Sequence, residues 1–76
     1  MSAWGVATMD GGVEFIASTK RECVEHVAAK TDGAPVHRVR AGLYEVQSSP
    51  ATYWIGTLYR LAHEGWDISL RMWAER

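Results

Sequence analysis

Two stretches of the chain repeat one order of structural signals, and this order constrains the fold more than any other feature of the sequence. Each stretch contains a strand-like run, a glycine-bearing turn, a second strand-like run, a helix-like run and a closing glycine. The first stretch covers 4–33 and the second covers 36–65. An alternating run over 66–73 has the pattern of a closing strand. The sequence therefore predicts one α+β domain with the element order ββαββαβ.

The first unit has clear signals for a hairpin and a helix. The turn is expected at Asp10-Gly11-Gly12, because glycine adopts the positive φ angles of a tight turn without strain. Thr19 and Glu22 have the spacing of a capping box, and Gly33 is expected to end the helix that follows. A two-residue turn would direct four apolar side chains to the core, namely Trp4, Val6, Val13 and Phe15.

The second unit is expected to begin with a hairpin over 36–47 around Ala41-Gly42. In that register, the core face would carry the pairs Val39–Tyr44 and His37–Val46. The opposite face would carry the pairs Arg38–Glu45 and Arg40–Leu43. Ser49-Pro50 has the pattern of a helix start, and Trp54, Leu58 and Leu61 recur at helical spacing up to Gly65. The likeness of the two halves is explained by duplication of an ancestral unit, or equally by the element order that any two ββα units have in common.

The alternation over 66–73 indicates a sheet with one covered face and one open face. Apolar and polar side chains would point to opposite sides of the closing strand. Both helices are therefore expected on the same side of a mainly antiparallel sheet.

Composition narrows the possible classes of protein. The 76 residues include 8 Lys and Arg against 9 Asp and Glu, a net charge of −1, whereas nucleic-acid binders usually carry a basic excess. No apolar run is long enough to cross a bilayer, so we expect no membrane partner. Cys23 is the only cysteine, which excludes an intrachain disulfide and fits a soluble cytoplasmic protein. A domain this small often gains stability by association, and a homodimer is one expectation.

No residue pattern indicates an enzyme, a cofactor or a metal. Cys23 and His26 lie three positions apart, but a zinc site needs further ligands that the spacing does not supply. Carboxylates at Glu14, Glu45 and Asp67 would share the open face with arginines or water, which is typical of solvated strand charges. The chain is therefore expected to bind a partner without catalysis.

The open sheet face is the expected binding surface. Arginine and tryptophan are enriched at the energetic centres of protein interfaces. The residues expected there are Arg38, Arg40, Glu45, Arg71 and Trp73. A protein partner is the first interpretation of this surface. The alternatives are that Trp73 merely packs over the arginine side chains to cover the edge, that the face is a homodimer interface, or that it binds RNA or DNA, with Trp73 stacking on a base.

In its general organisation, the whole chain resembles the single-domain accessory proteins of bacteriophages and other mobile elements, including anti-CRISPR and similar anti-defence inhibitors. The hairpin and helix over 4–33 and the compact ending over 65–76 carry this resemblance. The resemblance implies a protein that blocks a larger host complex by occupying part of its surface. It assigns a role to no individual residue.

Overall fold

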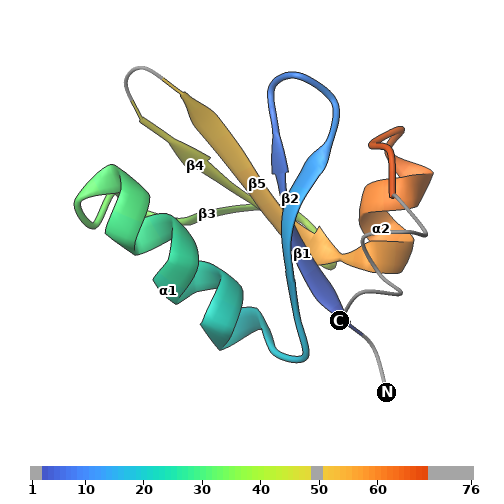
Figure 1. Cartoon of the computed structure of the whole chain (residues 1–76), viewed down its shortest axis with the longest axis horizontal. Helices are drawn as coiled ribbons and strands as arrows, with labels where there is room; N and C mark the ends of the chain where they lie inside the picture. Colours follow the sequence, from blue (N-terminus) through green and yellow to red (C-terminus); the bar gives the residue numbers. More distant parts are fainter. Residues whose placement is uncertain (1–2, 49–50, 69–76) are drawn as a thin grey trace.

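In the described part of the chain, the fold is a single five-stranded sheet with two helices (Figure 1). The computed structural model describes residues 3–48 and 51–68. Every neighbouring pair of strands is antiparallel, and the strand order across the sheet is β2-β1-β5-β4-β3. The elements are β1 (Trp4–Thr8), β2 (Val13–Ala17), α1 (Lys20–Thr31), β3 (His37–Arg40), β4 (Leu43–Gln47), β5 (Thr52–Thr57) and α2 (Leu58–His63). The predicted α+β class and the antiparallel sheet are confirmed.

The first hairpin and α1 form where the sequence predicts them. Gly11 has a φ of 97° in the turn between β1 and β2. The hydroxyl of Thr19 accepts a hydrogen bond from the Glu22 amide (3.2 Å), which caps α1 at its first turn. The helix ends at left-handed Asp32 and Gly33, because these residues reverse the chain without continuing the helical ladder.

The long second helix predicted from Ser49-Pro50 is wrong over Thr52–Thr57. This segment is β5, which pairs with β1 on one side and β4 on the other. Its threonines and aromatic side chains favour a strand, and the sheet supplies partners for both of its edges. The second helix begins only at Leu58, where the Thr57 hydroxyl accepts a hydrogen bond from the Arg60 amide at 3.0 Å. Over residues 3–48 and 51–68, the element order is therefore ββαβββα.

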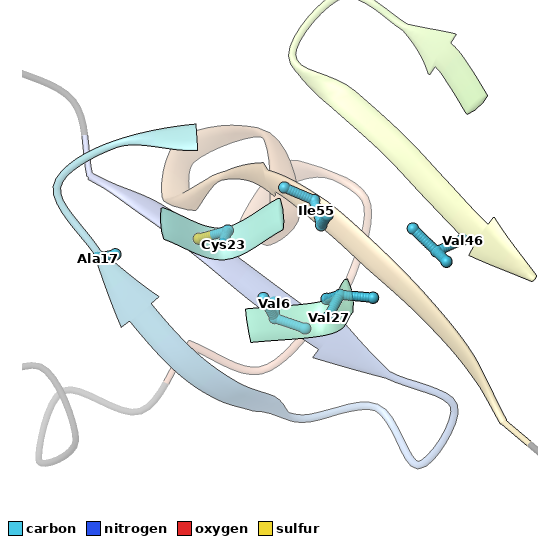
Figure 2. Packing of buried hydrophobic residues seen from close by; sticks show 6 residues of the cluster. All are labelled: Val6, Ala17, Cys23, Val27, Val46 and Ile55. Atoms are coloured by element: carbon cyan, nitrogen blue, oxygen red, sulfur yellow. The ribbon is translucent and has the colours of Figure 1, made fainter. Parts of the chain in front are cut away.

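The two helices lie on opposite faces of the sheet, so the expectation that they share one face is also wrong (Figure 1). Val6 and Ala7 are neighbours on β1, point in opposite directions and are both fully buried. Val6 belongs to a core with Cys23 and Val27 of α1, which Figure 2 shows. Ala7 belongs to a second core with Leu61 of α2. Both faces of the central strands are therefore covered.

A bulge in each hairpin changes the expected register. In the first hairpin Val6 pairs with Phe15 but Ala7 pairs with Val13, so Glu14 is the extra residue. Val13 consequently packs in the second core rather than beside Val6. Ile16 is also buried in the second core.

In the second hairpin, Val39 is the extra residue. Arg38 pairs with Tyr44 and Arg40 with Leu43, while His37 pairs with Glu45. The predicted Arg40–Leu43 pair is confirmed, whereas the other three expected pairs are wrong. Val39 is 43% exposed and does not enter the core.

The predicted closing strand falls largely on residues 69–76, outside the described part of the chain. Within 66–68, Asp67 forms a single parallel bridge with Gly12, and its amide donates to the Gly11 carbonyl at 2.9 Å. Trp66 and Ile68 pack against the second core. Over the described residues, neither helix has the length and apolar character that a bilayer crossing demands.

Candidate functional site

The least covered regular element is β3, at one edge of the sheet. All four of its residues are exposed, and Val36 just before it is 37% exposed. Helix α1 packs against β1, β2 and β5, and α2 packs against β1 and β5, so β3 lies beyond the main contacts of both helices. We call the strand His37–Arg40 the β3 edge.

The bulge at Val39 sends the two arginines of β3 to opposite faces of the sheet. Residues that pair directly across two strands point to the same face. Arg38 pairs with Tyr44, whose ring lies near Lys20 of α1. Arg40 pairs with Leu43, which belongs to the core beneath α2. The two arginines therefore flank the edge from both sides and do not form one flat patch.

On the α1 side, cations and aromatic rings gather around Tyr44. The Lys20 ammonium nitrogen lies 3.8 Å from the centre of the Tyr44 ring, a cation–π geometry. The rings of Trp4 and Tyr44 are tilted with their centres 6.4 Å apart. The Arg38 side chain makes no hydrogen bond or ion pair in the described part of the chain. Its guanidinium is available to an incoming group.

On the α2 side, two arginines share one carboxylate. Glu64 Oε2 lies 3.2 Å from Arg40 Nη1 and 3.4 Å from Arg60 Nη1. The Arg40 side chain remains 57% exposed. Because one carboxylate faces two guanidinium groups, this cluster keeps a net positive charge.

The Glu45 side chain is hydrogen-bonded within the protein. Its carboxylate accepts hydrogen bonds from Trp54 Nε1 and from Gln47 Nε2, each at 3.1 Å. Trp54 in turn lies 5.1 Å from Trp66, measured between ring centres. Glu45 therefore holds the Trp54 ring in place on the α2 side of the sheet. Arg71 and Trp73, the other two residues expected at the binding surface, lie outside the described residues.

A second cluster joins α1 to β2. The Glu14 carboxylate lies 2.9 Å from His26 Nε2 and 3.0 Å from Lys30 Nζ. The His26 ring stacks on Phe15, with the ring centres 4.0 Å apart. The bulge at Glu14 turns its side chain towards the helix, which the sequence pattern did not reveal. The only sequence signal was the one-turn spacing of His26 and Lys30, which places two basic groups on one side of α1.

Opposing effects act on the Glu14 carboxyl. Partial burial raises its pKa. Hydrogen bonds from His26 and Lys30, together with the charges of these residues, lower the pKa by more than burial raises it, so the pKa lies below its ordinary value. The hydrogen bond to Glu14 raises the pKa of Lys30. A carboxylate engaged by both partners favours the docking of α1 on β2 and is poorly placed to accept a proton from a substrate.

The described residues contain no group of His, Cys, Asp and Glu side chains arranged to hold a metal ion. Cys23 and His26, considered for such a site, separate: Cys23 is buried in the core and His26 contacts Glu14. No known protein family, no curated protein and no solved structure matches this chain.

Proposed function

We propose that this chain is a small non-enzymatic protein-binding module that acts through the β3 edge, as a stoichiometric inhibitor of a larger complex. The observation that supports the proposal is that all four residues of β3, two arginines and Val39 among them, are exposed at an edge of the sheet beyond the main contacts of both helices. Arginine beside exposed apolar side chains is characteristic of protein interfaces. The single cysteine fits action in a reducing cytoplasm.

Binding of RNA or DNA through the α1 side of the same edge is the alternative. Tyr44 and Trp4 are half-buried rings with Lys20 and Arg38 nearby, and such sets can stack bases and contact phosphates. Two features favour the protein partner. Lys20 already occupies a face of the Tyr44 ring, and the net charge of the chain is −1.

The test is capture of a partner by tagged protein from a cell lysate, with and without nuclease. Val39→Asp places a charge at the centre of the β3 edge, and Val39 is exposed enough for the domain to tolerate it. Arg21→Glu is the matched control, because the Arg21 side chain is 88% exposed on α1 and its one ion pair among the described residues is with Glu25. Circular dichroism should confirm that both variants are folded.

We expect wild type and Arg21→Glu to recover the same protein at a fixed molar ratio, and Val39→Asp to lose it. A single hot-spot substitution of about 2 kcal/mol would weaken capture about thirtyfold. Capture that persists with Val39→Asp would contradict the proposal. Capture that disappears after nuclease treatment would support the nucleic-acid alternative.

A further inference from the structure

We infer that the β3 edge recognises an extended acidic segment of its partner, which pairs alongside β3 as an additional strand. The inference rests on the proposed function, because it uses the same edge, and it adds the chemistry and the geometry of the segment that binds there.

The backbone of β3 is available for pairing on its outer side. β3 is the last strand in the order of the sheet and has β4 as its neighbour. Among the described residues, no turn or loop backbone hydrogen bond uses a group of His37–Arg40. An edge strand of this kind presents unpaired N–H and C=O groups, and an extended peptide can join them.

The charges around β3 favour a peptide of negative charge. Four cations, Lys20, Arg38, Arg40 and Arg60, surround the edge. Of the two nearby carboxylates, Glu64 bridges two of these arginines, and Glu45 is held by Trp54 and Gln47. The edge is therefore positive, although the whole chain carries a net charge of −1. Carboxylates on an added strand would meet the unpaired guanidinium of Arg38 on one face and, on the other, two arginines that share a single carboxylate.

The same charges disfavour a second copy of this chain as the occupant. Antiparallel pairing of two β3 strands would bring Arg38 and Arg40 of each copy close to those of the other, and like charges across strands destabilise the pairing. A positively charged, short and bulged edge strand is also a common protection against self-association. That protection does not act against an acidic strand, because its carboxylates are attracted to the cations around β3.

The bulge predicts the spacing of the acidic residues. Arg38 and Arg40 point to opposite faces because Val39 is the extra residue between them. Successive side chains of an extended strand also point to opposite faces. A segment with two adjacent carboxylates can therefore reach Arg38 with one and Arg40 with the other. Carboxylates two positions apart would both lie on one face and reach only one of the arginines.

Three capped hexapeptides test the inference by NMR titration of isotope-labelled protein. Thr-Val-Glu-Glu-Val-Thr has adjacent glutamates, and Thr-Glu-Val-Glu-Val-Thr has the same composition with the glutamates two positions apart. Thr-Val-Lys-Lys-Val-Thr reverses the charge. We expect the adjacent-glutamate peptide to shift the amide signals of His37–Arg40 and to bind about two- to fivefold more tightly than its isomer. We expect the lysine peptide not to bind.

The double variant Arg38→Glu/Arg40→Glu should reverse the preference, so that the lysine peptide binds and the adjacent-glutamate peptide does not. Arg21→Glu makes the same kind of charge change at an exposed position on α1 and should leave the preference unchanged. Amide shifts confined to other elements, equal binding of the two glutamate peptides, or tighter binding of a ten-nucleotide oligo-dT would each overturn the inference. A homodimer that the double variant abolishes, measured by light scattering, would also overturn it.

The two proposals fail in different ways. Lysate capture that depends on Val39, without binding of the adjacent-glutamate peptide, would leave the proposed function intact and overturn the acidic strand. Loss of both results would overturn both proposals.

Discussion

Replacing Gly56 with alanine would test the position of β5 in the centre of the sheet. A Cβ atom at this position would lie 2.8 Å from the Gly42 carbonyl oxygen, 3.2 Å from Leu61 Cδ2 and 3.4 Å from Leu43 Cδ1. The nearest of these atoms belongs to backbone, and the same carbonyl accepts a hydrogen bond from the Thr57 amide at 3.3 Å. The clash cannot be relieved by a side-chain rotation. We therefore expect Gly56→Ala to lower the free energy of unfolding by about 1–3 kcal/mol, the usual cost of overpacking.

The sign of this effect separates two folds. In a helix running from Pro50 to Gly65, residue 56 would be an interior glycine, and alanine would stabilise the domain by about 1 kcal/mol. In the sheet, the same change destabilises. Urea unfolding followed by tryptophan fluorescence measures this difference in free energy. In thermal unfolding, each kcal/mol should shift the melting temperature by about 4–8 °C in a domain of this size.

Gly5→Ala is the matched control on the neighbouring strand. A Cβ atom there would lie 2.9 Å from Leu58 Cδ2 and 3.2 Å from both Leu61 Cδ1 and Val13 Cγ1. These atoms are the ends of side chains, which can move, so we expect a smaller loss than for Gly56→Ala. Unchanged or increased stability of Gly56→Ala would refute the placement of β5 and of α2 against it.

Two further predictions concern polar contacts that the bulges and β5 create. Because the pKa of Glu14 lies below its ordinary value, its ion pairs stabilise the fold above the unfolded-state pKa and are lost as the pH falls through the folded-state pKa. Glu14→Gln should therefore be less stable at neutral pH and lose less stability on acidification, as measured by thermal unfolding over a pH series; parallel pH profiles would contradict this. Trp54→Phe removes the donor to Glu45 and should cost about 1–2 kcal/mol. Glu45→Ala removes the acceptor, and in a double-mutant cycle the two losses should not add. Additive losses would show that this hydrogen bond contributes nothing.

Local chemistry was sufficient to predict the elements of the first half of the fold, although not the register of its hairpin. Gly11 and Gly33 occupy positive φ angles, at a hairpin turn and a helix end, and Thr19 caps α1. Such signals act between residues close in sequence, so they can be recognised without knowing the rest of the fold. The turn at Gly42, with a φ of 75°, was predictable for the same reason.

The sequence did not determine which arginines share a surface. The residues of the second hairpin were assigned to β3 and β4 from their alternation, but the extra residue at Val39 shifts the register. A bulge leaves no clear mark in a short strand, and one added residue reverses the direction of every side chain beyond it. Arg38 and Arg40 consequently lie on opposite faces, and that geometry underlies the inferred spacing of the acidic segment.

By itself, the sequence determined the α+β class, the turns and α1, because these depend on contacts between neighbouring residues. The tertiary structure decided the state of Thr52–Thr57, where the apolar spacing suits a helix but the threonines and aromatic residues suit a strand. This segment became β5 because β1 and β4 offer backbone partners on both sides and because α1 and α2 bury its two faces. Pairing and burial between distant segments outweighed the local helical pattern.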